Sequence, residues 1–226
     1  MKIAILGGTG HEGAGLAYRW AAKGHTIIIG SRSAERAAQA ADELTNKLTL
    51  ISPNHGPLTG TDNLTAAQQG EIVVLSVPYS AQTPTLNAVK EALHDKILLT
   101  VVAPLGPKAA RTWIPPEGSA AQQAQDLLGD TARVVAAFQT IGAAHLQDLD
   151  HVIDCDVLVC GDKKADRDIA VSLATDAGMR GVHAGSLVNA QVPEALVSML
   201  IAINIRYKIK DAGIRITGLD NAPQEA

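Results

Sequence analysis

The sequence has few aromatic side chains, which make up 3% of its 226 residues. Aliphatic side chains must therefore fill the core, and a hydrophobic content of 46% is enough for a full-sized one. Cysteine is also scarce, because Cys155 and Cys160 are the only two. Five positions along a strand place them on opposite faces, which suits neither a disulfide nor a shared metal. We therefore expect two buried thiols and no metal site.

The chain also has no excess of positive charge and few long apolar runs. The formal net charge of −4 argues against nucleic acid or an anionic membrane surface as a partner. The first apolar run stops at Leu6, too early for the core of a signal peptide. The last apolar stretch, Ala195 to Ile205, is limited by Asn204 and Arg206, and we judge it too short to span a bilayer. We expect a soluble, cytoplasmic protein whose partners are small molecules.

Short β-branched runs alternate with alanine-rich helical stretches in the first two thirds of the chain. The expected strands are continuous apolar runs, which is typical of a sheet covered on both faces. The alternation predicts an α/β fold with a Rossmann-type doubly wound parallel sheet and right-handed crossovers. We expect strands at KIAIL (2–6), TIIIG (26–30), EIVVLSV (71–77), KILLTVV (96–102) and ARVVAAF (132–138), and helices at about 11–23, 33–47, 81–93 and 119–128.

The pattern becomes less regular after Leu149. Strands are expected at 154–162 and 180–185, with helices at 164–177 and 190–208. We interpret residues 1–149 as a Rossmann domain and residues 150–226 as a smaller C-terminal α/β domain. The long helix is apolar on more than one face, which predicts a homodimer interface, with burial against the first domain as the alternative.

A glycine loop follows the first strand. Gly8, Gly10 and Gly13 form a G-x-G-x-x-G motif that opens a helix, the context in which this motif predicts dinucleotide binding. Gly8 would permit the tight turn, Gly10 the approach of the pyrophosphate, and Gly13 the packing of helix on strand. Between them, His11 is either beside the pyrophosphate or exposed, and Glu12 is expected to point away from the phosphates. A purely structural glycine turn is the alternative.

The end of the second strand has no acidic residue. A carboxylate there would bind the ribose hydroxyl of NAD, whereas an arginine suits the 2′-phosphate of NADP. Ser31 and Ser33 offer hydroxyl groups, Arg32 offers a planar fork matched to phosphate oxygens, and Arg36 lies one helical turn further on. The segment predicts NADP as the cofactor and residues 1–149 as the NADP-binding domain. A solvated basic helix start is the alternative.

Several segments in order then show a family resemblance over nearly the whole chain. The segments ILGGTGHEGAGLAYRWAAKGHTIIIGSRSAERA, VVLSVP, DCDVLVCGD, GMRGVHAGSLVNA and AGIRITGL together resemble the NADPH-dependent coenzyme F420 reductase family. The resemblance implies hydride transfer between NADP and the 8-hydroxy-5-deazaflavin coenzyme F420, which acts as a co-substrate. It also implies that the deazaflavin binds in a cleft closed by the smaller domain.

The resemblance extends to individual positions. It implies NADP contacts from Thr9, Ser31, Arg32 and Arg36, and nicotinamide contacts from Val77 and Pro78. The residues it places around the deazaflavin are Ala103, Gln139, Ile141, Ser186, Leu187 and Leu219. Gln139 stands where the family pattern leads us to expect a histidine. Its amide can hydrogen-bond a ring carbonyl or amide but cannot supply a positive charge.

The sequence contains no recognisable catalytic dyad, nucleophile motif or metal-ligand spacing, so we predict no catalytic side chain. A hydride can pass between two rings that are held face to face, and this orientation alone lowers the barrier. Three alternatives remain open: an NADP-dependent reductase of a small imine or ketone, a reductase of a flavin or quinone, and a non-enzymatic NADP-binding redox sensor. A ketone reductase of similar build would use the lysine of a K-x-x-N arrangement. In this chain Ser186 stands where that lysine would precede Asn189.

Overall fold

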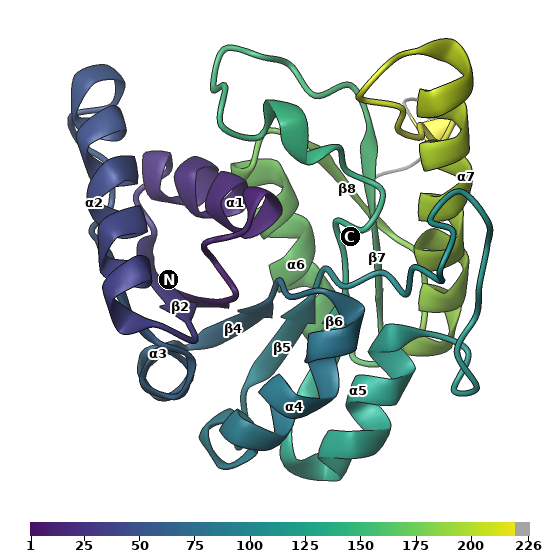
Figure 1. Cartoon of the computed structure of the whole chain (residues 1–226), viewed down its shortest axis with the longest axis horizontal. Coiled ribbons are helices and arrows are strands. Elements are labelled where there is room, and N and C mark those ends of the chain that lie inside the picture. The colour runs from purple at the N-terminus through teal and green to yellow at the C-terminus, as the bar shows by residue number, and fades with distance from the viewer. Residues whose placement is uncertain (220–226) are drawn as a thin grey trace.

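The computed structural model describes residues 1–219, which form one eight-stranded sheet with helices on both faces (Figure 1). The strands are β1 (Lys2–Leu6), β2 (Thr26–Ser31), β3 (Leu58–Asp62), β4 (Ile72–Leu75), β5 (Ile97–Thr100), β6 (Arg133–Ala136), β7 (Asp156–Gly161) and β8 (Arg180–His183). The α-helices are α1 (His11–Ala22), α2 (Ala34–Ile51), α3 (Asn63–Gln69), α4 (Tyr79–Val89), α5 (Ala120–Leu128), α6 (Lys164–Asp176) and α7 (Gln191–Tyr207). Short 3-10 turns are η1 (Lys90–Leu93), η2 (Gly129–Thr131), η3 (Ala143–His145) and η4 (Leu187–Ala190).

The strand order is β3-β2-β1-β4-β5-β6-β7-β8, which confirms the doubly wound fold. The strands from β3 to β6 are parallel, and β1 pairs with both β2 and β4. The chain therefore reverses its direction of winding between β1 and β4, where ligands bind in such sheets. The sheet is not wholly parallel, because β7 runs antiparallel to β6. The connection between these two strands has only η3 and no crossover helix, which a parallel pair would require.

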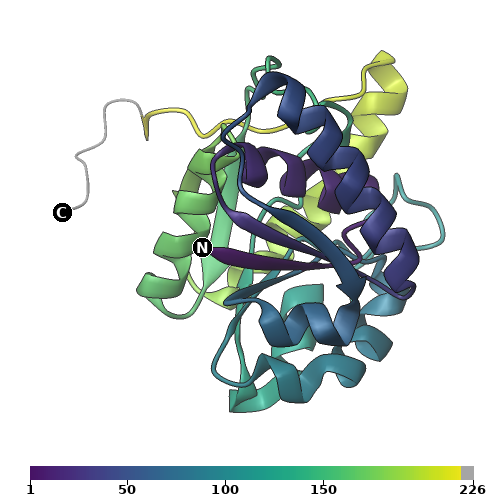
Figure 2. The same ribbon diagram turned by 90° about the vertical axis from the view of Figure 1, so that its left-hand side faces the viewer.

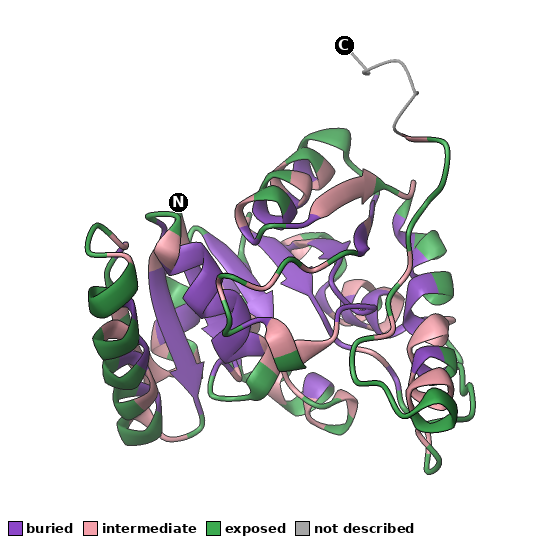
Figure 3. Cartoon of the chain, turned by 90° about the horizontal axis from the view of Figure 1, so that it is seen from above, coloured by how far each residue is buried: buried purple, intermediate pink, exposed green. Residues whose placement is uncertain are grey.

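Each face of the sheet has its own apolar core. Ile3 and Ile5 of β1 pack with α1, α2 and α6, while Ala4 and Leu6 pack with α3, α4 and α5. Figure 2 shows the strands between these two groups of helices, and Figure 3 shows that the buried residues follow the strands and α1. Cys155 belongs to the first core and Cys160 to the second, and both are free and buried, as expected.

β3 and α3 were not among the predicted elements. The strand LTGTD is an edge strand of small and polar residues, and only its pairing with β2 identifies it. Asp62 then caps α3, because its Oδ1 accepts a hydrogen bond from Thr65 N at 2.9 Å.

The C-terminal third of the chain shares the sheet of the first part through β7 and β8. The division at residues 149 and 150 stays a prediction, and its last residues, 220–226, lie outside the described part of the chain. The last apolar segment is longer than expected, so the prediction that it is too short to span a bilayer is wrong. Because η4 leads directly into α7, residues 187–207 make one helix that is long and apolar enough to cross a membrane by length and composition alone. Glu194 and Ser198 of this helix are nevertheless buried within the protein.

Candidate cofactor-binding site

The glycine loop turns at Gly7 rather than at Gly8. Gly7 has a φ of +75°, and a Cβ on it would lie 2.4 Å from Ser76 O. Gly8 is required for a different reason, because its Cβ would lie 2.8 Å from Ile5 O. A Cβ on Gly13 would lie 2.9 Å from Gly8 Cα, so the start of α1 packs closely on the loop. Gly10 is exposed and has only Gly7 O near its missing Cβ, at 3.5 Å, which leaves room for a ligand above it.

A cavity of about 670 Å³ lies over this loop at the carboxyl ends of β1 and β2, and we call it the Arg32 cavity. It brings together most of the residues predicted to bind the phosphates and the adenosine half of NADP. Its lining includes Thr9, Gly10, Ser31, Arg32, Ser33, Arg36, Val77 and Pro78.

Arg32 and Arg36 present free positive charge to this cavity. Both are exposed, and within residues 1–219 neither guanidinium group has a hydrogen-bond or ion-pair partner. Ser33 is engaged locally instead: its Oγ caps α2 by accepting from Arg36 N at 3.3 Å and donates to Glu35 Oε2 at 2.7 Å. This hydrogen bond also lowers the pKa of Glu35. Ser31 is buried at the end of β2, and its Oγ accepts a hydrogen bond from Ser33 N at 3.4 Å, which leaves its hydroxyl proton free to be donated.

Asn63 is a lining residue that the sequence analysis missed. Its Oδ1 accepts a hydrogen bond from Gly7 N at 3.4 Å, so it braces the glycine loop from the first residue of α3. Since β3 and α3 were not recognised, this residue had no predicted position near the loop. The cap sequence Asp62-Asn63-Leu64-Thr65 was the signal that could have found it.

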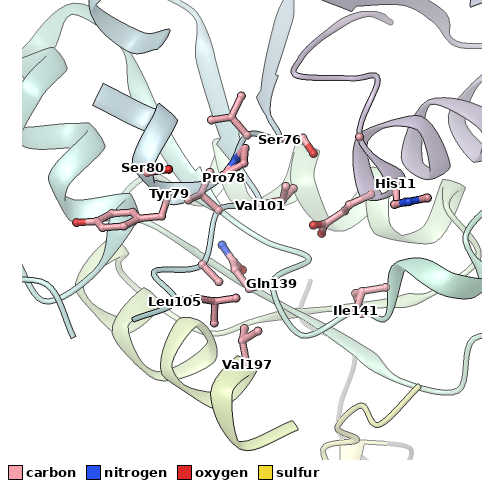
Figure 4. A pocket seen from close by; sticks show the side chains of 15 residues that line it. His11, Ser76, Pro78, Tyr79, Ser80, Val101, Leu105, Gln139, Ile141 and Val197 are labelled. Carbon is pink, nitrogen blue, oxygen red and sulfur yellow. The ribbon is translucent and has the colours of Figure 1, made fainter. Parts of the chain in front are cut away.

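A second cavity, of about 500 Å³, continues the first along the same edge of the sheet. We call it the Gln139 cavity (Figure 4). Gly10, Ser76, Val77, Pro78 and Ser80 line both cavities, which therefore form one groove. The predicted residues Ala103, Gln139 and Ile141 meet in this second part, together with His11 and Glu12. Residues not among the predicted site residues are Ser76, Tyr79, Ser80, Val101, Val102, Leu105 and Val197.

Gln139 offers the Gln139 cavity an acceptor rather than a donor. Its Nε2 donates to Thr100 O at 3.0 Å, while its Oε1 is buried without a partner in the described chain. The preceding residue, Phe138, is buried and has a φ of +73°, a backbone conformation that costs about 1–3 kcal/mol for a side chain of this size. Trp20 holds the Phe138 ring in an edge-to-face contact with the centroids 5.7 Å apart. The core therefore imposes the turn that aims Gln139 at the cavity.

Glu12 is the acidic residue of this groove. It lines the Gln139 cavity and not the Arg32 cavity. Its orientation relative to the phosphates stays a prediction. Its Oε1 is buried and has no partner among the residues described. This burial raises the pKa of Glu12 to about 8.

Three residues predicted at the deazaflavin line neither cavity. Leu187 is buried in the core, and its N–H donates to Asp162 Oδ1 at 3.0 Å. Ser186 is exposed beside it, and Leu219 is half-buried at the end of the described chain. Their contacts with a ligand stay predictions.

His145, His151 and Asp211 place their possible ligand atoms within 4.8 Å of one another, although no metal site was expected. The two imidazole rings are stacked with centroids 3.9 Å apart, and Asp211 is exposed. None of the three lines the groove.

Comparisons with known proteins identify the family of this chain. The family model described as NADP oxidoreductase, coenzyme F420-dependent, matches residues 2–104. The F420-dependent NADP reductase of Methanocaldococcus jannaschii is 42% identical over 97% of this chain and 100% of its own length. This chain belongs to the coenzyme F420-dependent NADP oxidoreductase family.

One further relative and one solved structure also match nearly the whole chain. The F420-dependent NADP reductase of Methanothermobacter marburgensis is also 42% identical, over 97% of this chain and 99% of its own. A crystal structure from Arthrobacter sp. FB24, assigned provisionally as an F420-dependent NADP reductase, superposes with a TM-score of 0.78 at 25% identity. It covers 96% of this chain and 99% of that one.

Proposed function

We propose that this protein transfers a hydride between NADP(H) and coenzyme F420, the two substances that the names of its relatives contain. The observation that carries the proposal is the single groove at the carboxyl edge of the sheet. One part is open and basic, and the other is walled by apolar side chains with two unpartnered oxygens, those of Glu12 and Gln139. A phosphate-rich cofactor suits the first part, and a planar ring with N–H groups suits the second.

The residues of the Arg32 cavity fit NADP. Free N–H groups at the start of α1 and the open space above Gly10 suit the pyrophosphate, with Thr9 beside it. Ser31, Arg32 and Arg36 would hold the 2′-phosphate, because two unpaired guanidinium groups supply charge and donors that an NAD site does not need. Val77 and Pro78 would direct the nicotinamide into the Gln139 cavity, since they line both cavities.

The residues of the Gln139 cavity fit a planar heterocycle. Val101, Ala103, Leu105 and Val197 provide apolar walls. Figure 4 shows Gln139 among Val101, Leu105 and Val197. The free Oε1 of Gln139 would accept a hydrogen bond from a ring N–H and fix the rotation of the ring in its plane.

The two bound cofactors supply the hydride chemistry, and the protein aligns them. The apolar walls exclude water, and Gln139 and Pro78 restrict the positions that two stacked rings can take in the groove. No side chain is required as a nucleophile, and an imine, a ketone, a quinone or a sensor role finds no support in the names of the relatives.

The proposal is tested by mixing the protein with NADPH and oxidised F420 and following the visible absorbance of the deazaflavin. We expect rapid bleaching with NADPH and little with NADH. Binding of NADPH without bleaching would contradict the proposed acceptor while leaving the cofactor assignment intact.

We further propose that the protein acts as a cytoplasmic homodimer without nucleic-acid or membrane partners. The net charge of −4 disfavours binding to polyanions. Exposed apolar side chains on and next to α7 supply a surface that a second copy could cover, and they include Val188, Val192, Met199, Ile205, Tyr207, Trp113 and Ile114.

A further inference from the structure

Glu12 has no structural partner that explains an acid at this position. It lies in the first turn of α1, where the positive end of the helix dipole favours a carboxylate, yet its Oε1 is buried without any hydrogen bond in residues 1–219. A buried acceptor left unpaired destabilises a fold. Its side chain lines the Gln139 cavity, so a ligand bound there could pair with it.

The position of Glu12 in the groove indicates which part of a ligand it would meet. Gly10, the N-cap of α1, lies on the surface shared by the two cavities, whereas Glu12 lines only the Gln139 cavity. A dinucleotide whose pyrophosphate lies over Gly10 and whose 2′-phosphate lies at Arg32 must extend its second half past Glu12. That half is the nicotinamide. This step rests on the function proposed above.

The titratable side chains around Glu12 indicate which group its carboxylate could pair with. The other titratable side chains lining the cavity are His11, next to it, and Tyr79 of α4. The Tyr79 hydroxyl accepts a hydrogen bond from Gln123 Nε2 at 3.0 Å, and burial raises the pKa of Tyr79, so this group stays neutral. No lysine or arginine belongs to the described lining. A carboxylate of Glu12 would therefore lack a permanent cation in the protein.

The oxidised cofactor carries the missing positive charge. The nicotinamide of NADP⁺ is a pyridinium, whereas that of NADPH is an uncharged dihydropyridine. We propose that Glu12 discriminates between the two oxidation states of NADP: its carboxylate pairs with the pyridinium of NADP⁺, and its neutral acid form accommodates the reduced ring of NADPH. The pyrophosphate repels the carboxylate equally in both complexes, so its effect cancels in the comparison.

This assignment couples cofactor preference to pH. Because burial raises the pKa of Glu12 to about 8, this carboxyl ionises between about pH 7 and pH 9. Binding of NADP⁺ favours the carboxylate and releases a proton. By linkage, the preference for NADP⁺ over NADPH must rise as the pH rises through the ionisation of Glu12.

The test measures the dissociation constants of NADP⁺ and NADPH by titration calorimetry between pH 6 and pH 9, without F420. For the unmodified protein we expect the ratio of NADPH to NADP⁺ dissociation constants to rise by about tenfold over this range. In Glu12→Gln, which keeps the shape but cannot ionise, the ratio should not change with pH. Glu43→Gln on the exposed surface of α2 makes the same substitution away from the groove and should behave like the unmodified protein.

A second readout needs no variant. Repeating the NADP⁺ titration of the unmodified protein near pH 7 in two buffers of different ionisation enthalpy should show proton release. A pH-independent ratio in the unmodified protein, or an unchanged pH dependence in Glu12→Gln, would overturn the role of Glu12 while leaving NADP binding established. Failure of both cofactors to bind would instead overturn the proposed function and this inference with it.

Discussion

Arg32 and Arg36 each place a guanidinium group in the open part of the groove, and neither group has a partner within residues 1–219. We predict that Arg32→Ala weakens NADPH binding about 10- to 100-fold, since a charge-assisted hydrogen bond contributes about 1.5–3 kcal/mol. NADH has no 2′-phosphate and should bind with nearly unchanged affinity. Fluorescence titration of both cofactors measures the effect, with the exposed Lys47→Ala as control. An equal loss for NADH and NADPH would rule out the 2′-phosphate contact.

The buried carboxyl of Glu12 also has a consequence for stability. Its pKa is about 8 in the folded protein and close to its usual value of 4.5 in the unfolded chain, so the folded state holds the proton more tightly. The resulting stabilisation is complete below pH 4.5 and is lost as the pH rises through 8. Relative to the unmodified protein, Glu12→Gln should gain roughly 4 kcal/mol between pH 4.5 and pH 9.

Thermal unfolding of the free protein measures this difference. We expect the Tm of Glu12→Gln to rise relative to the unmodified protein by about 8–16 °C between the two pH values. Parallel curves of Tm against pH for the two proteins would contradict burial of an ionisable group at this site.

At the scale of elements, Arg19 joins α1 to the segment that follows β6. Its guanidinium group donates to the backbone oxygens of Leu146 at 2.9 Å, Asp148 at 2.7 Å and Ala177 at 3.0 Å, and also to those of His145 and His151. Arg19→Ala would leave these carbonyl groups unpaired, so we predict a loss of at least about 3 kcal/mol in the free energy of unfolding. Urea denaturation tests this, and a loss below about 1 kcal/mol would show that water replaces the arginine.

Glu194 anchors α7 to the start of α5. Its two carboxylate oxygens accept hydrogen bonds from Ala120 N at 2.6 Å and Ala121 N at 3.0 Å, although burial raises its pKa to about 7. We predict that Glu194→Ala destabilises the protein by about 2 kcal/mol. It should also raise the KM for F420 more than that for NADPH, because Val197 on the same helix lines the Gln139 cavity.

Steady-state kinetics and amide hydrogen exchange check the Glu194 prediction. Glu194→Gln keeps one acceptor oxygen and should be intermediate in both measurements. Equal changes in the KM values for F420 and NADPH would contradict a contribution of α7 to deazaflavin binding.

At the scale of the whole molecule, the exposed apolar surface of α7 bears on assembly. Met199 is 54% exposed and Tyr207 71%, which is unusual for side chains on a helix otherwise anchored in the fold. If a second copy covers this surface, Met199→Asp should convert a dimer of the protein into a monomer. Analytical ultracentrifugation decides this, and a monomeric unmodified protein would contradict the dimer.

The architecture was largely predictable, because its signals are local. Continuous apolar strands, alanine-rich helices and the right-handed crossover rule predict the winding of β1 to β6. The apolar strand pattern is absent from LTGTD. Its half-exposed residues resemble a loop in the sequence, and only their pairing with β2 makes them a strand. The strand expected at 154–162 is present as β7, but its antiparallel direction was not predicted, because strand direction depends on the path of the connection that precedes it.

The sequence by itself determined the parts of the site that lie within a few residues of one strand end: the glycine loop, and Ser31 and Arg32 at the end of β2. Tertiary structure alone decided which polar atoms remain free. Gln139 keeps only its acceptor because Thr100, 39 positions away, takes its donor. Glu12 keeps a carboxyl without a partner because the surfaces packed around it offer none in the described chain. Hydrogen-bond satisfaction depends on which distant segments come together, and no local pattern records that.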